Sequence, residues 1–220
     1  MKRINSIIPK TDENFVQACV LYNLAPRIEV SMEELIQQLL CFGKLDHLHI
    51  ELIKSKCEVV QVKKGTYFLK TGRVVSRVGY ITEGILRVGY DDPKGEDTTR
   101  YFITENHFAA DIKSFLLQTP STAYFEALTD CSLLTFSVAD FALLGNAIPC
   151  WNDIFSKLTA AYLAEKVRIS RELLTLDAKS RYLLFLDYFP GLANRVPLSS
   201  LASFLGITRS SLSRVRKNIC

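Results

Sequence analysis

The decisive stretch of this 220-residue chain lies near its C-terminus and reads Pro197-Leu198-Ser199-Ser200-Leu201-Ala202-Ser203-Phe204-Leu205-Gly206-Ile207-Thr208-Arg209-Ser210-Ser211-Leu212-Ser213-Arg214-Val215-Arg216-Lys217. Its apolar residues predict two short amphipathic helices, because they recur at the spacing that forms one helical face. The first face consists of Leu198, Leu201, Ala202 and Leu205, and the second contains Leu212 and Val215. Gly206 predicts the turn between the helices, and Thr208 is a favourable N-cap for the second one.

The outward face of the second helix is basic and rich in serine. It presents Arg209, Ser210, Ser213, Arg214, Arg216 and Lys217, and no acidic residue occurs from Leu198 onward. Such a helix, braced by another across a tight turn, fits the major groove of DNA, where the N-terminal residues of a recognition helix contact base edges. The same pattern also occurs in helix pairs that contact protein, or whose charged face is simply solvated, so a ligand-binding or protein-interaction module stays open as an alternative.

The charge of the chain is distributed unevenly. The formal net charge is +4, whereas the segment from Asp177 to Cys220 alone has seven basic and two acidic residues. The remainder is therefore close to neutral. A basic terminal segment on a near-neutral body is the electrostatic footprint expected of a nucleic-acid-binding protein.

The cysteines and the hydropathy pattern exclude several classes of protein. Cys19, Cys41, Cys57, Cys131, Cys150 and Cys220 lack paired spacing, which favours free thiols in a reducing cytoplasm over disulfides or a metal site. No apolar run is long enough to span a membrane, and the N-terminus does not resemble a signal peptide. No nucleophile–base pair or phosphate-binding glycine loop indicates an enzyme, and we expect no cofactor.

The central part of the chain changes from helical to alternating periodicity. Helices are predicted from Met32 and over Asp46–Lys56, after which short strands follow one another between glycine-containing turns, as in an all-β sandwich or barrel. The strands are expected at 58–62, 67–69, 76–81, 85–90, 98–103, 123–128 and 132–137. Glu83-Gly84 is interpreted as a two-residue hairpin turn between two of these strands.

A long helix is predicted after Pro149, from Trp151 to about Leu176, because this stretch lacks proline and glycine. Phe155, Leu158, Tyr162, Ile169 and Leu173 lie close to a heptad stripe on it. A stripe of this length can pack on the body of its own chain, but it favours a dimerisation helix that packs against a second copy. Asp177 is expected to cap the next helix.

Three segments carry a resemblance to a known family. They are Gly65-Thr66-Tyr67-Phe68-Leu69-Lys70-Thr71-Gly72, Tyr80-Ile81-Thr82-Glu83-Gly84-Ile85-Leu86-Arg87, and Leu201 to Arg214 of the helix pair. In this order, and with the long helix between them, they resemble the Crp/Fnr superfamily of bacterial transcription regulators, in the style of its divergent Bacteroidetes-type members. The resemblance covers about Met32 to Cys220.

The resemblance implies an α+β architecture in four parts. These are an N-terminal extension over 1–31, a cyclic-nucleotide-binding-like β-roll or jelly-roll sensor domain over 32–148, a dimerisation helix over 149–176, and a helix-turn-helix DNA-binding domain over 177–220 with a reduced or absent wing. It also implies a homodimer on a pseudo-palindromic double-stranded DNA site, with RNA polymerase as a further partner and with an effector that the sequence does not identify.

The effector pocket departs from the family pattern. Relatives that bind cyclic AMP have Phe-Gly-Glu at the start of the phosphate-binding segment and an Arg before its final Ser or Thr. Here the corresponding residues are Phe108, Ala109, Ala110 and Asp111, followed by Ser121 and Thr122. A cyclic phosphate needs a cation and a close approach of the backbone, so we expect no binding of cyclic AMP in the usual way.

The recognition helix follows the family pattern more closely. Arg209 and Arg214 occupy the two arginine positions that the resemblance assigns to base edges, whereas Ser210 replaces a glutamate common in relatives. Ser199, Thr208 and Ser211 are candidates for phosphate contacts, and Arg216 and Lys217 for neutralising backbone charge.

Overall fold

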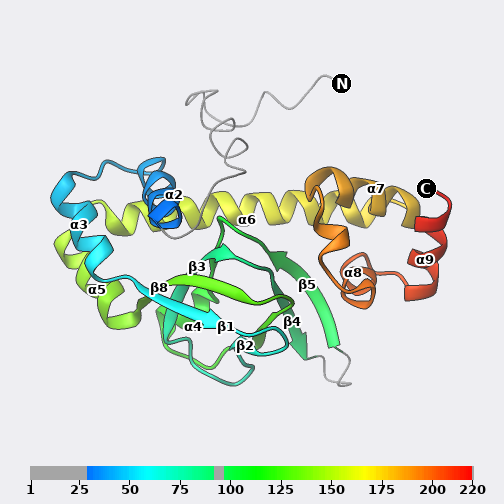
Figure 1. Cartoon of the computed structure of the whole chain (residues 1–220), viewed down its shortest axis with the longest axis horizontal. Coiled ribbons are helices and arrows are strands. Elements are labelled where there is room, and N and C mark those ends of the chain that lie inside the picture. Colours follow the sequence, from blue (N-terminus) through cyan, green and yellow to red (C-terminus); the bar gives the residue numbers. More distant parts are fainter. Residues whose placement is uncertain (1–28, 92–96, 220) are drawn as a thin grey trace.

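The computed structural model describes residues 29–91 and 97–219, and the extension expected over 1–31 lies almost entirely outside them. Two four-stranded antiparallel sheets form the centre of the molecule (Figure 1). The first has the order β1-β8-β3-β6, and the second the order β2-β7-β4-β5. Their bounds are β1 Glu58–Val62, β2 Tyr67–Leu69, β3 Arg77–Glu83, β4 Leu86–Asp91, β5 Asp97–Ile103, β6 Phe108–Ala109, β7 Ala123–Ala127 and β8 Cys131–Ser137.

The hairpin expected at Glu83-Gly84 is wrong. β3 pairs with β8 and β6, whereas β4 pairs with β5 and β7, so the chain crosses from one sheet to the other at this point. Gly84 has a φ of +101°, and a Cβ there would lie 2.5 Å from the carbonyl oxygen of Asp130. The glycine therefore permits a close crossover between the two sheets instead of a tight hairpin.

The core between the sheets comes from alternating inward-facing residues. Fully buried members include Ile81, Leu86, Val88, Phe125 and Leu133. In the first sheet both faces are buried, because Ile81 and Leu133 belong to the core between the sheets, while Tyr80, Leu134 and Phe136 pack in a second cluster with the helices.

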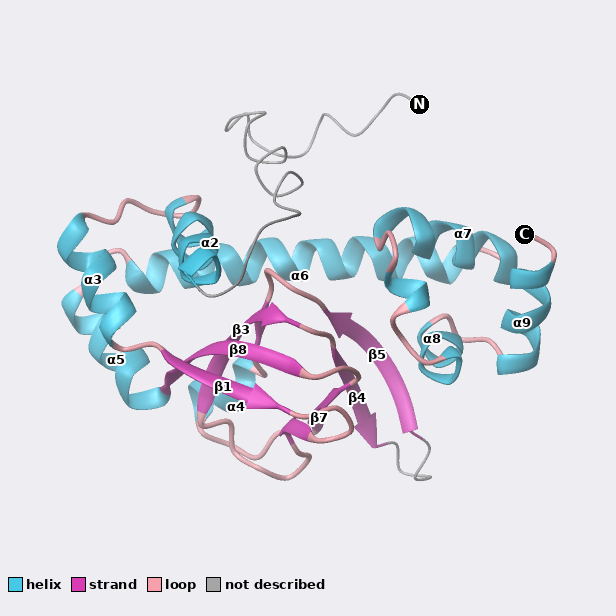
Figure 2. Cartoon of the chain, in the orientation of Figure 1, coloured by secondary structure: helices cyan, strands magenta, loops and turns pink. Residues whose placement is uncertain are grey.

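Helices surround the sheets at both ends and along one edge (Figure 2). α2 Glu29–Leu40, α3 His47–Ser55, α5 Val138–Ala147 and the start of α6 Trp151–Thr175 pack around the buried Trp151 at one end. α6 extends along the molecule to the other end, where α7 Ala178–Tyr188, α8 Leu198–Phe204 and α9 Arg209–Lys217 lie (Figure 1). α4 Ile112–Leu117 and a short 3₁₀ turn over Leu192–Asn194 complete the elements.

Several helix ends form as the sequence predicts. Asp177 accepts a hydrogen bond from the Ser180 backbone N–H at 2.8 Å, and Asp46 accepts one from the His49 N–H at 2.8 Å. These carboxylates satisfy N–H groups that have no partner inside a helix. In the part of the chain that the structure describes, no helix is both long and apolar enough to cross a bilayer.

Candidate nucleic-acid interface and ligand pocket

The helix pair near the C-terminus has the predicted geometry. Gly206 adopts a φ of +66°, the left-handed conformation that ends α8. Thr208 then caps α9, because its Oγ1 accepts a hydrogen bond from the Ser211 N–H at 3.1 Å. Leu201, Ala202, Leu205 and Leu212 are buried, so the two helices share one small core.

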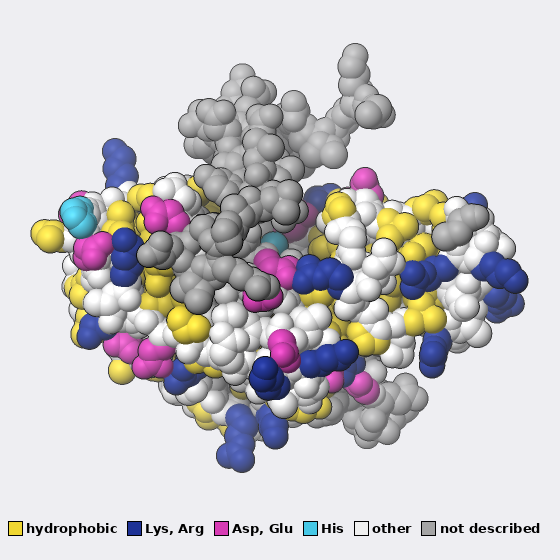
Figure 3. Space-filling view, in the orientation of Figure 1, with side chains coloured by type: hydrophobic (Ala, Val, Ile, Leu, Met, Phe, Trp, Pro, Cys, Tyr) yellow, Lys and Arg dark blue, Asp and Glu magenta, His cyan; other side chains and the backbone are white. Residues whose placement is uncertain are grey.

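The polar face of α9 is directed to solvent. Arg209, Ser210, Ser213, Arg214 and Lys217 are exposed. Figure 3 shows Lys and Arg side chains at the end of the molecule that α9 forms. Arg216 differs, since it is half-buried and donates a hydrogen bond to Asn194 Oδ1 at 3.2 Å.

The hydroxyl groups considered for phosphate contacts have unequal environments. Ser199 is exposed in the first turn of α8. The Thr208 hydroxyl also donates to Ser211 Oγ at 2.9 Å, so both side chains already serve the cap of α9. A wing would follow α9, and the structure describes only Asn218 and Ile219 there, so that expectation stays a prediction.

The helix pair packs against strand β5, a contact that the sequence analysis missed. The Ser203 hydroxyl of α8 accepts a hydrogen bond from the Thr99 backbone N–H at 2.9 Å. The Phe102 ring of β5 lies 5.5 Å from the ring of Phe204 and 6.4 Å from that of Phe185, measured between centroids. Phe102 alternates with the inward-facing Ile103, and this outward aromatic residue was the available signal for a partner on the outer face of the sheet.

An ion pair adds to the same contact. Arg195 donates to Glu105 Oε2 at 3.0 Å, and Glu105 Oε1 accepts the Gly84 backbone N–H at 3.0 Å. Burial acts to raise the pKa of Glu105, but the hydrogen bonds from Arg195 and from the backbone outweigh it and hold that pKa below its ordinary value. The loop before α8 is thus attached to the crossover between the sheets.

A cavity of about 740 Å³ lies between the sheets, α4 and α6. Of the six residues expected in an effector pocket, Phe108, Ala110 and Asp111 line it, whereas Ala109 is fully buried, Ser121 is buried and Thr122 is exposed outside the lining. Asp111 caps α4, and its Oδ2 accepts a hydrogen bond from the Ser121 hydroxyl at 2.6 Å. The carboxylate is therefore occupied within the protein.

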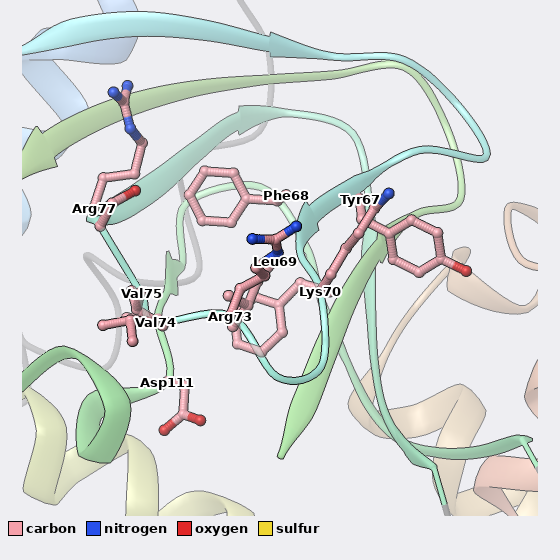
Figure 4. Close-up of a pocket in the computed structure, with 12 residues that line it drawn as sticks. Tyr67, Phe68, Leu69, Lys70, Arg73, Val74, Val75, Arg77 and Asp111 are labelled. Carbon is pink, nitrogen blue, oxygen red and sulfur yellow. The ribbon is translucent and has the colours of Figure 1, made fainter. Parts of the chain in front are cut away.

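A second pocket of about 230 Å³ lies on the other side of Asp111 (Figure 4). Arg77 at this pocket pairs with Glu58 at 3.3 Å, and Lys70 lies 5.6 Å from the centre of the Tyr67 ring. Ligand cavities usually measure about 300–1,000 Å³, so the larger cavity is the better candidate for a ligand site.

The stripe expected to dimerise the long helix is used inside the chain. Leu158 is buried, Phe155 packs against Phe108 and Phe141, and Tyr162 accepts a hydrogen bond from Gln38 at 2.7 Å. Ile169 is half-buried, and Leu173 packs against the core of the helix pair. These side chains cover the double sheet and the helix pair of their own chain, so they do not form an exposed stripe.

A different stripe of α6 is exposed. Leu163, Val167 and Leu174 are 60%, 50% and 77% exposed, and Ala160 is exposed as well. Their positions, 160, 163, 167 and 174, fall on a heptad seam, in which the position between Val167 and Leu174 is the polar Ser170. The sequence contained both stripes. The double sheet buries the first one and the second stays exposed, with Ala160 and Leu163 also lining the large cavity.

A known family model matches the part of the chain that forms the two sheets. Residues 59–146 match the family model described as "Cyclic nucleotide-binding domain". No curated protein matches the chain.

Solved structures of similar fold extend over most of the chain. The catabolite activator protein of Thermus thermophilus is 21% identical, with 83% of this chain and 86% of that chain covered and a TM-score of 0.52. The c-di-GMP-responsive global regulator CLP of Xanthomonas campestris is 17% identical, with 79% and 91% covered and a TM-score of 0.62. A CooA mutant of Carboxydothermus hydrogenoformans is 16% identical, with 77% and 78% covered and a TM-score of 0.58. The chain therefore contains, over residues 59–146, a domain of the cyclic nucleotide-binding fold, and it resembles these regulators in overall fold.

Proposed function

We propose that this chain is a homodimeric transcription regulator of the Crp/Fnr type that binds DNA in a sequence-specific manner and acts in the cytoplasm. The observation that carries the proposal is the exposed face of α9, where Arg209 and Arg214 project from a capped amphipathic helix. Arginine forms bidentate hydrogen bonds to the O6 and N7 atoms of guanine, the commonest specific base contact. RNA polymerase is the further partner of such a regulator.

Dimerisation is proposed to use the exposed seam of α6. Ala160, Leu163, Val167 and Leu174 would pack against the same residues of a second copy, as in a parallel coiled coil. The two recognition helices would then contact half-sites about one turn of DNA apart, so the operator would be a pseudo-palindrome.

The Val167→Glu variant should be monomeric at micromolar concentration, because it would bring two carboxylates into the apolar seam of the dimer. The measurement is sedimentation velocity, with wild type expected at twice the mass of one chain. Ala161→Glu is the matched control, since Ala161 is exposed on the same helix outside the seam. A Val167→Glu protein that still sediments as a dimer would place the interface elsewhere.

The sensor domain is proposed not to respond to cyclic AMP. Ala109 and Ala110 stand where relatives have Gly-Glu, no arginine precedes Ser121, and the nearby Asp111 carboxylate is engaged by Ser121. A cyclic phosphate would therefore lack both its cation and its ribose acceptor at these positions.

DNA binding is tested by selecting sites from random DNA and then titrating the selected site in gel shifts. Affinity should fall steeply with salt, because bound cations are released from the phosphates on binding. Arg209→Ala and Arg214→Ala should each weaken binding to the selected site by about tenfold or more and relax base preference at one position. The matched control is Lys64→Ala, at an exposed turn of the double sheet.

Arg216→Ala and Lys217→Ala should instead weaken the binding of all DNA sequences to a similar extent, as expected of phosphate contacts. If both arginine variants bind DNA as wild type does, α9 is not the recognition helix. If no DNA is selected at all, the helix pair contacts protein, and the alternative function is the correct one.

A further inference from the structure

The ammonium group of Lys166 lies at the large cavity without an acidic partner. Its Nζ is 3.7 Å from the centre of the Tyr101 ring, and both residues line the cavity. Among the carboxylates whose side chains the structure describes, over residues 31–90 and 97–219, none forms an ion pair with Lys166. Although the residue as a whole is exposed, its ammonium lies against the Tyr101 ring, and this partial burial lowers the pKa of Lys166 to about 8.

The rest of the cavity wall is apolar and aromatic. Its aromatic part includes Phe108, Phe115, Phe125, Phe141 and Phe155. Such a wall stabilises an apolar ligand by removing its surface from water. Its polar groups are neutral hydroxyls and one amide, apart from the charged Asp111, Lys113 and Lys166.

Two other charged groups line the cavity, the carboxylate of Asp111 and the ammonium of Lys113, and their opposite charges offset each other. Asp111 is bonded to the Ser114 backbone N–H and to the Ser121 hydroxyl. Lys113 is exposed at the first turn of α4. Lys166 thus supplies a cation against an apolar volume, and its residue remains accessible from solvent, so that a ligand can reach it.

We infer that this cavity binds a small organic acid with an apolar body, whose carboxylate pairs with Lys166 while its chain or ring fills the aromatic space. This inference rests on the proposed function, in which the cavity is the sensor site, and it names the chemical class of the effector. The charge of the ligand is set by Lys166, and its apolar character by Phe108, Phe141 and Phe155.

The chain contains its own reporter for this test. Trp151 is the single tryptophan, and its ring lies 4.7 Å from that of Phe155 and 5.4 Å from that of Phe141, both of which line the cavity. Titration of the full-length protein with decanoate should therefore change the tryptophan fluorescence, and calorimetry would give the same affinity. Decanol serves as the uncharged analogue, and cyclic AMP and cyclic GMP as the nucleotide probes.

Decanoate should bind about tenfold more tightly than decanol, because only the carboxylate can form a charged hydrogen bond with the Lys166 ammonium. A tenfold ratio corresponds to about 1.4 kcal/mol, which is within the range of such a bond. Lys166→Met should abolish the preference for decanoate and leave decanol binding unchanged. The matched control is Lys157→Met, which removes an exposed lysine of the same helix that pairs with Asp153 and does not line the cavity.

Three outcomes would overturn the inference: no binding of decanoate, equal binding of decanoate and decanol, or a preference that persists in Lys166→Met. Micromolar binding of either cyclic nucleotide would overturn the proposal on cyclic AMP. Because the readout needs no DNA, a protein that selects DNA sites but ignores decanoate refutes the ligand class alone. A protein that binds decanoate but no DNA refutes the proposed function instead.

Discussion

Replacing Phe185 with alanine should lower the free energy of unfolding by about 3–5 kcal/mol, the usual cost of removing a large buried aromatic side chain. Phe185 is 1% exposed, and its ring contacts those of Phe102, Phe189 and Phe204. The variant would leave a cavity where α7, α8 and β5 meet. Urea denaturation followed by circular dichroism gives the difference directly.

Leu183→Ala is the matched control for this variant. Leu183 lies on the same helix but is 43% exposed, so its loss should change the free energy of unfolding by less than about 1 kcal/mol. If Phe185→Ala proved as mild as Leu183→Ala, the packing of the helix pair against β5 would not contribute to stability in solution. The helix pair would then have to be mobile relative to the double sheet.

Replacing Arg87 with methionine should cost about 3 kcal/mol, the lower end of the range for breaking a buried ion pair, because it leaves the largely buried carboxylate of Glu126 without compensation, whereas that of Asp97 is 59% exposed. The Arg87 side chain is 9% exposed, and it donates to Glu126 Oε2 from Nε at 2.8 Å and to Asp97 from Nη1 at 2.8 and 2.9 Å. Glu126 is 22% exposed, so its charge is only partly solvated after the substitution. The measurement is again urea denaturation at neutral pH.

The double variant Arg87→Met with Glu126→Met should recover much of this loss, since an apolar pair of similar volume can replace a buried ion pair at little cost.

Burial acts to raise the pKa of Asp97, but hydrogen bonds from Tyr124 and Arg87 hold it below its ordinary value. The stability that this depressed pKa contributes is present above about pH 4 and is lost as the pH falls through the folded-state value. An Arg87→Met protein as stable as wild type would show that the ion pair is solvated after all.

Local elements could be predicted well from the sequence. The strands at 58–62 and 67–69 have the predicted bounds, the long helix covers Trp151–Thr175, and Gly206 and Thr208 perform their expected roles. These features depend on neighbouring residues only, through turn conformation, capping and periodicity.

Contacts between elements that are distant in the sequence could not be predicted as well. α6 contains two apolar stripes, and the sequence does not say which one the double sheet will bury. The pairing of β3 with β8 instead of β4 has the same origin, because an alternating strand fits several partners equally well. For the same reason the wall of the cavity that α6 contributes, Phe155, Tyr162 and Lys166 included, emerged only from the three-dimensional arrangement.

Neighbouring residues of β5 belong to two different surroundings. Tyr101 lines the cavity beside Lys166, and Phe102 packs against Phe185 and Phe204 of the helix pair. A single strand, β5, thus separates the cavity from the helix pair that contains α9. Phe102 and the hydrogen bond from Thr99 to Ser203 attach this strand to the helix pair, next to the residue that lines the cavity. A single peptide unit, the one between Tyr101 and Phe102, therefore joins the wall of the cavity to the contact with the helix pair.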